Sequence, residues 1–166
     1  MSRKYWILLG VVGVLVGLDQ VTKYWIMSIY RIGETLPVIP GVFNITYVRN
    51  TGAAFSFMAN ADPAFRIPFF LVLPLGALAG IGYVFRKTPE TNRLLIWGLS
   101  LTVAGAIGNL IDRVIFESVT DFLHFHWWSR YHFPMFNVAD IAICVGVGLL
   151  LLDLMKKEVK TPSPAK

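Results

Sequence analysis

Four aspartates are the residues of this sequence whose type and placement could do chemistry. Asp19, Asp112 and Asp140 each interrupt or end a long apolar run, and Asp121 precedes the last of these runs. Two carboxyl groups that face one cavity can share a proton, so that one activates water while the other hydrogen-bonds to a carbonyl oxygen. Such a pair can hydrolyse a peptide bond, although glycoside hydrolysis uses carboxylate pairs at other separations. The residue types therefore indicate a hydrolase without fixing its substrate.

The composition is that of an integral membrane protein. Of 166 residues, 55% are hydrophobic and 15% are charged, and the mean hydropathy is +0.61. Soluble domains carry about 25% charged residues. The net charge of +5 could suit a nucleic acid, but the charges flank apolar runs, so we expect no nucleic-acid partner. The lone Cys144 excludes an internal disulfide and a cysteine-based metal cluster.

Four apolar runs are long enough to cross a bilayer as helices, which takes about 20 residues each. No small-x-small cleavage site follows the first run, so we interpret it as an uncleaved helix. We expect a mainly α-helical membrane protein built as a single domain over residues 1–166. The expected spans are 5–27, 67–85, 94–113 and 136–154, and 157–166 is expected to be a flexible cytoplasmic tail.

The lysines and arginines predict the orientation of these spans. One side carries Arg31, Arg49, Arg66 and Arg130. The other side carries Arg3, Lys4, Arg86, Lys87, Arg93, Lys156, Lys157, Lys160 and Lys166. The more basic side faces the cytoplasm, so both termini are expected there.

This orientation places the polar residues of the spans near the outer face. Asp19 lies about 21 Å along the first helix at 1.5 Å per residue. Asn109, Asp112 and Arg113 end the outward-running third helix, and Asn137 and Asp140 begin the inward-running fourth. Ionisable groups inside a membrane indicate a functional site. Their gathering at one depth argues against a channel and favours a site reached from the outer leaflet.

Structural interpretations of the same residues remain open at this point. Asp19 and Lys23 have the spacing of an ordinary helix ion pair, and Asn137 could cap the fourth helix. Asp140 is harder to explain in this way, because no basic residue lies within one turn of it.

The two outer segments differ in character. Residues 43–47 alternate apolar and polar side chains, which predicts a strand in a small extracytoplasmic β-sheet between the first two helices. The other segment, 117–132, is rich in aromatic residues, and Trp127, Trp128 and Tyr131 suit a membrane interface. His124, His126 and His132 could ligate zinc, but the sequence has no HExxH motif and no cysteine partner beside them.

Five blocks of the sequence resemble, in order and spacing, the signature blocks of the bacterial lipoprotein signal peptidases, the signal peptidase II family. They are Asp19-Gln20-Val21-Thr22-Lys23, Asn50-Thr51-Gly52-Ala53-Ala54-Phe55-Ser56, residues 105–113, Val119-Thr120-Asp121-Phe122 and Phe136-Asn137-Val138-Ala139-Asp140. One block alone is a weak signal, whereas five in order are specific.

The resemblance implies an aspartic endopeptidase that cleaves the signal peptide from diacylglyceryl-modified prolipoproteins, just before the lipidated cysteine. It implies a multi-pass, monomeric protein of the bacterial plasma (inner) membrane, with membrane lipids around it and no metal or other cofactor. The family's catalytic dyad matches Asp121 and Asp140. The positions that match the family's supporting residues are Asp19, Lys23, Asn50, Gly52, Asn109, Arg113, Asn137 and Ala139. Three residues depart from the family pattern: Ala104, Ile107 and Thr120, of which Thr120 replaces an apolar residue beside Asp121.

Three other classes of function remain possible from the residues alone. A lipid or peptide transporter would need polar groups in the inner half of the bundle, where the second span has none. A membrane scaffold gives no reason for the aspartates to meet at one depth. A zinc hydrolase that used the three histidines would lose its activity to a chelator.

Overall fold

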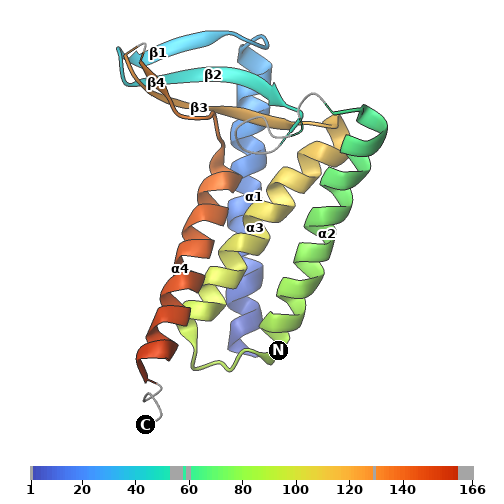
Figure 1. The fold of residues 1–166 in the computed structure, drawn as a ribbon, viewed down its shortest axis with the longest axis vertical. Coiled ribbons are helices and arrows are strands. Elements are labelled where there is room, and N and C mark those ends of the chain that lie inside the picture. The colour runs from blue at the N-terminus through green and yellow to red at the C-terminus, as the bar shows by residue number, and fades with distance from the viewer. Residues whose placement is uncertain (1, 53–57, 59–60, 129, 161–166) are drawn as a thin grey trace, which may run out of the picture.

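The computed structural model describes residues 2–52, 58, 61–128 and 130–160, and four long helices make up most of this part of the chain. They are α1 (Arg3–Ile29), α2 (Pro63–Lys87), α3 (Arg93–Phe116) and α4 (Val138–Lys160). Each is long and apolar enough to cross a membrane. The predicted helical membrane fold is therefore confirmed. In Figure 1, α1 begins and α4 ends at the end of the bundle opposite the sheet.

Local capping explains where these helices begin. The side chain of Asp62 accepts a hydrogen bond from the Ala64 amide at 2.8 Å, so α2 starts at Pro63, before the expected 67. Asn92 caps α3 in the same way through the Leu95 amide. At its other end α4 extends through Lys160, into the segment expected to be a tail, and residues 161–166 lie outside the described residues.

A four-stranded antiparallel sheet lies at the end of the bundle where α1 ends and α4 begins (Figure 1). Its strands, in spatial order, are β1 (Thr35–Ile39), β2 (Phe43–Asn50), β3 (Val119–Trp127) and β4 (Tyr131–His132). The strand expected at 43–47 forms the first five residues of β2. The sheet is larger than expected, because the segment between α3 and α4 contributes β3 and β4. Pairing of β2 with β3 thus joins the two outer segments into one sheet.

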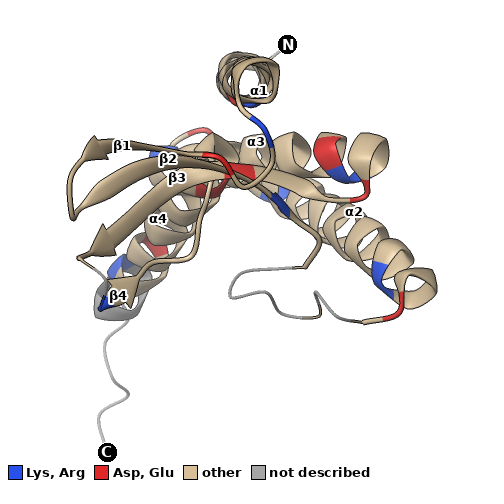
Figure 2. Cartoon of the chain, turned by 90° about the horizontal axis from the view of Figure 1, so that it is seen from above, with Lys and Arg blue, Asp and Glu red and all other residues tan. Residues whose placement is uncertain are grey.

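Helices α3 and α4 pack more closely against each other than the other helices do. Close approach of α3 and α4 depends on glycines: a Cβ on Gly146 would lie 2.5 Å from the Thr102 hydroxyl, and one on Gly105 would collide with the Ala139 carbonyl. By contrast, a Cβ on Gly10 or Gly80 would meet nothing within 4 Å. Viewed from above, the sheet spreads from the bundle on the side of α4, and α2 lies on the other side, where it packs chiefly against α3 (Figure 2).

Candidate active site

The start of α4 holds Asp140 in place through a reciprocal capping box. The Asn137 side chain accepts a hydrogen bond from the Asp140 amide at 3.0 Å, and Asp140 Oδ2 accepts one from the Asn137 amide at 3.1 Å. The carboxylate therefore lies at the positive end of the α4 dipole. The expectation that Asn137 caps this helix is confirmed, and the cap also positions Asp140.

Asp121 projects from β3 toward the same asparagine. Its Oδ1 accepts a hydrogen bond from Asn137 Nδ2 at 2.7 Å, and its Oδ2 accepts one from Asn50 Nδ2 at 2.9 Å. Only 2% of Asp121 is exposed. Burial and the negative charge of Asp140 raise the pKa of Asp121 to about 7, although the two asparagine hydrogen bonds act in the opposite direction. Asp121 therefore titrates near neutral pH, beside a second carboxyl group bound to the same asparagine.

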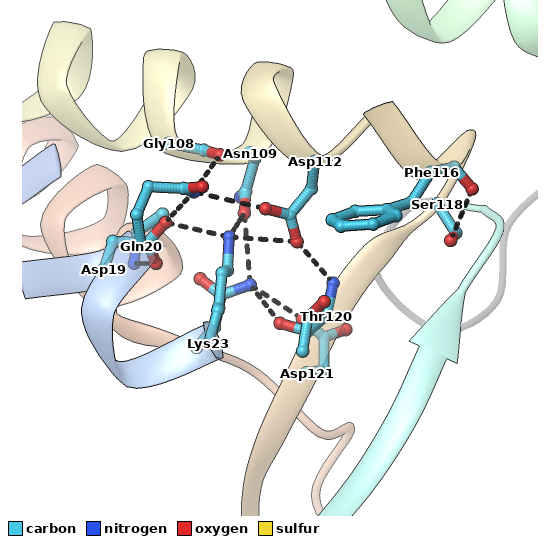
Figure 3. A network of polar contacts seen from close by, with 12 residues as sticks. Asp19, Gln20, Lys23, Gly108, Asn109, Asp112, Phe116, Ser118, Thr120 and Asp121 are labelled. Atoms are coloured by element: carbon cyan, nitrogen blue, oxygen red, sulfur yellow. Dashed lines mark hydrogen bonds and ion pairs between the residues drawn. The ribbon is translucent and has the colours of Figure 1, made fainter. Parts of the chain in front are cut away.

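Asn109 of α3 connects Asp140 to α1. Its Nδ2 donates to Asp140 Oδ1 at 2.7 Å, while its Oδ1 accepts from Lys23 Nζ at 3.0 Å and from Asn137 Nδ2 at 3.1 Å. An ammonium group can only donate, so Lys23 fixes which end of the Asn109 amide faces Asp140. Figure 3 shows Lys23, Asn109 and Asp121 converging between α1, α3 and β3.

Lys23 is buried between two carboxylates. Its Nζ lies 2.9 Å from Asp19 Oδ2 and 3.5 Å from Asp112 Oδ2, and each of the three residues is 1% exposed. Asp19 Oδ1 also accepts the Ala139 amide at 2.9 Å. The predicted helix ion pair is present, and the hydrogen bond from the Ala139 amide ties Asp19 of α1 to the first turn of α4.

Gly52 and Arg113 approach the site through Asn50. The Gly52 amide donates to Asn50 Oδ1 at 3.0 Å, and Arg113 lies 3.4 Å from the Gly52 carbonyl. The Arg113 guanidinium lies over the Phe70 ring, 5.0 Å from its centroid. The Arg113 and Phe70 side chains line a small, open hollow between α2 and α3, together with Thr51, Arg66, Ile67, Leu71 and Glu117. The remainder of this signature block, 53–56, lies outside the described residues.

The structure thus brings all the predicted site residues into one connected set of contacts, and it adds Asp112 and Gln20, which were not among the residues that the family resemblance implied. Asp112 Oδ2 accepts the Thr120 amide at 2.8 Å, and Gln20 Nε2 donates to both Asp112 and Asp19 at 3.2 and 3.1 Å. Asp112 was one of the four aspartates singled out in the sequence. Gln20 gave no signal beyond its place in a signature block.

The three histidines also come together, but away from this set of contacts. His124 Nε2 lies 3.1 Å from His132 Nδ1, and His126 Nδ1 lies 2.9 Å from the Trp128 carbonyl. Burial and the neighbouring imidazoles lower the pKa of His124. Within the described part of the chain, no group of three or more His, Cys, Asp or Glu side chains is arranged to hold a metal ion. The structure therefore gives the zinc alternative no support.

Comparison with known proteins agrees with this geometry. Residues 11–156 match the family described as signal peptidase (SPase) II. Proteins named lipoprotein signal peptidase from Geobacter metallireducens and Geobacter sulfurreducens are 48% and 49% identical, covering 95% and 89% of this chain and 96% and 90% of their own lengths. Two solved structures described as a bacterial membrane enzyme superpose with TM-scores of 0.82 and 0.79, each at 34% identity. They cover 96% and 90% of this chain and 94% and 93% of their own.

Proposed function

The chain belongs to the signal peptidase II family, and from this premise we propose that Asp121 and Asp140 are the catalytic dyad with which it cleaves prolipoprotein signal peptides. The family assignment replaces the transporter and scaffold alternatives. The observation that carries the dyad is the shared asparagine: Asn137 Nδ2 donates to Asp121 while its backbone amide donates to Asp140. A single residue thus holds both carboxyl groups at one point.

The mechanism follows from the shared proton. Near neutral pH the pair holds one proton, because a second negative charge beside the first is unfavourable in a buried site. The ionised carboxylate removes a proton from water, which attacks the scissile carbonyl, while the protonated carboxyl hydrogen-bonds to the carbonyl oxygen. The tetrahedral intermediate then collapses as a proton passes to the leaving amine. Because the two carboxyl groups titrate as a coupled pair, the roles of acid and base are not assigned to one aspartate each.

The other residues of the site keep this pair in position. Asn109 donates to Asp140 and is oriented by Lys23. Asn50 donates to Asp121, and its side-chain oxygen accepts a hydrogen bond from the Gly52 amide. Asp19 supports Lys23 and the Ala139 amide. Arg113 lies on the open side of the site, where its guanidinium can bind carbonyl oxygens of the substrate peptide.

The dyad also suits a substrate that is anchored in the outer leaflet. We place both termini in the cytoplasm on the distribution of lysine and arginine, which puts the sheet and the dyad near the outer face. The small hollow beside Arg113, which both apolar and charged side chains line, then lies where a diacylglyceryl group would bring the scissile bond. On this proposal the chain works as one membrane-embedded domain, surrounded by lipid and without a second subunit.

Cleavage of a diacylglyceryl-modified precursor peptide in detergent, with EDTA present, tests the dyad. We expect the unmodified protein to cut just before the lipidated cysteine, and Asp121→Asn and Asp140→Asn each to abolish turnover. Asp62→Asn is the matched control, since Asp62 is exposed and asparagine caps a helix as well as aspartate does. Near-full activity in either dyad variant would refute the dyad, and loss of activity only with EDTA would implicate a metal.

A further inference from the structure

Arg49 lies behind the dyad, on the opposite face of the sheet. It pairs with Thr120 across β2 and β3, and Asp121 is the next residue of β3. Side chains alternate between faces along a strand, so Arg49 and Thr120 share one face while Asp121 points from the other. Arg49 therefore has no route to the substrate through its own side chain.

Several polar contacts and an aromatic ring hold the Arg49 side chain in place. Its NH1 donates to Thr120 Oγ1 at 3.1 Å and its Nε to the Tyr47 hydroxyl at 2.9 Å. The guanidinium carbon lies 4.1 Å from the centroid of the Phe116 ring. The ion pairs found among the described residues do not include Arg49. Its NH2 also lies 3.0 Å from the Met27 sulfur, so the cation is held by a hydroxyl, a phenol, a thioether and a ring face instead of a carboxylate.

Thr120 links this face of the sheet to the site. It is completely buried, its amide donates to Asp112 at 2.8 Å, and its carbonyl accepts from Asn137 Nδ2 at 3.3 Å. The backbone on the N-terminal side of Asp121 is thus fixed by two site residues. Its hydroxyl, at the position where the family resemblance leads us to expect an apolar residue, connects that backbone to Arg49.

From these contacts we infer that Arg49 and Thr120 form a positioning pair that aligns Asp121 with Asp140 from the far side of the sheet. This inference rests on the proposed dyad. The pair touches neither substrate nor reacting atoms. It limits rotation of β3 about its axis, which would otherwise move the Asp121 carboxyl away from Asn137.

A double-mutant cycle on the cleavage reaction tests the pair. We expect Thr120→Val, which keeps the shape and removes the hydroxyl, to lower kcat about tenfold and leave KM nearly unchanged, since small displacements of a catalytic group carry costs of this order. Thr120→Ser should restore most of the kcat. Arg49→Gln should lower kcat at least as much as Thr120→Val, because it also removes the contacts of Arg49 with Tyr47, Met27 and Phe116. The double variant should be no slower than Arg49→Gln alone, because that substitution has already removed the contact with Thr120.

The variants also separate positioning from stability. Full kcat in Thr120→Val with a lowered melting temperature would show a structural contact only, and additive losses in the double variant would show two independent effects. Either result overturns the pair. If Thr120→Val does not fold, Thr120→Ser and Arg49→Gln still decide the question through the kcat and KM split. If the positioning pair fails this test, Asp121→Asn and Asp140→Asn should still be inactive, because the dyad does not depend on Arg49. An active Asp121→Asn variant, by contrast, would refute the dyad itself.

Discussion

At the scale of single residues, the site depends on asparagine more than on charge. Asn137 bonds to both members of the proposed dyad, and Asn50 and Asn109 bond to one each. An amide can donate to a carboxylate without adding a charge of its own. The dyad thus keeps the mutual repulsion that retains one proton near neutral pH, while the formal charge of Lys23 is neutralised mainly by Asp19 and Asp112.

The pKa of Asp121 gives a prediction for the dependence of activity on pH. Since this pKa is raised to about 7, kcat/KM should fall as the pH rises above 7 and the shared proton is lost. The Asn50 hydrogen bond favours the ionised carboxylate, so Asn50→Ala should raise the pKa and move the alkaline limb upward, by up to about one pH unit.

The measurement is kcat/KM for the precursor peptide across pH 5 to about 9, with Asn44→Ala as the control in the same strand. Asn44 pairs with His124, away from Asp121 in the ladder, so its substitution should leave the limb in place. An alkaline limb that stays fixed in Asn50→Ala, or moves downward, would contradict the inference that this limb reports loss of the proton shared by Asp121 and Asp140.

At the scale of elements, the site is built where helix ends meet the sheet. Asp140 lies in the first turn of α4, Asp112 and Arg113 lie in the last turns of α3, and Asp121 lies near the start of β3. Their relative positions depend on how closely α3 approaches α4. A Cβ on Gly105 would meet the Ala139 carbonyl and lie 2.7 Å from the Ile143 side chain, so this approach requires glycine.

Gly105→Ala should therefore destabilise the protein and lower its activity together. Overpacking of this kind costs about 1–3 kcal/mol, and the displaced atom belongs to Ala139, directly before Asp140. Gly80→Ala in α2 is the matched control, because a Cβ there meets nothing within 4 Å. The measurements that check this prediction are the melting temperature in detergent and the kcat of each variant. Equal melting temperatures and rates in the two variants would show that the helix contact does not depend on Gly105.

The same elements show what the sequence could and could not predict. Apolar run lengths predicted the helices, and the alternation in 43–47 predicted β2. Conversely, β3 was hidden because its aromatic residues also suit a loop at a membrane interface, and its partner β2 is distant in sequence. The site residues were predicted through signature blocks and depth, whereas Gln20 and the Arg49–Thr120 contact depend on tertiary packing that no local pattern encodes.

At the scale of the whole molecule, one chain supplies every element of the site. Asp121 comes from β3 and Asp140 from α4, and the contacts that hold them come from α1, β2 and α3. The sheet joins segments that precede α2 and follow α3, so the proposed dyad needs both segments in place. A complete site within one chain predicts that a monomer is active.

Mixing two inactive variants tests this prediction. Asp121→Asn and Asp140→Asn, co-expressed and purified together in detergent, should show no recovered cleavage, since no molecule of either kind carries both carboxyl groups. A mixture of the unmodified protein with Asp121→Asn should be active in proportion to the unmodified fraction, and the activity per unmodified molecule should not change on dilution. Recovered activity in the mixture of the two variants would mean that chains exchange β3 or α4 and that the functional unit is an oligomer.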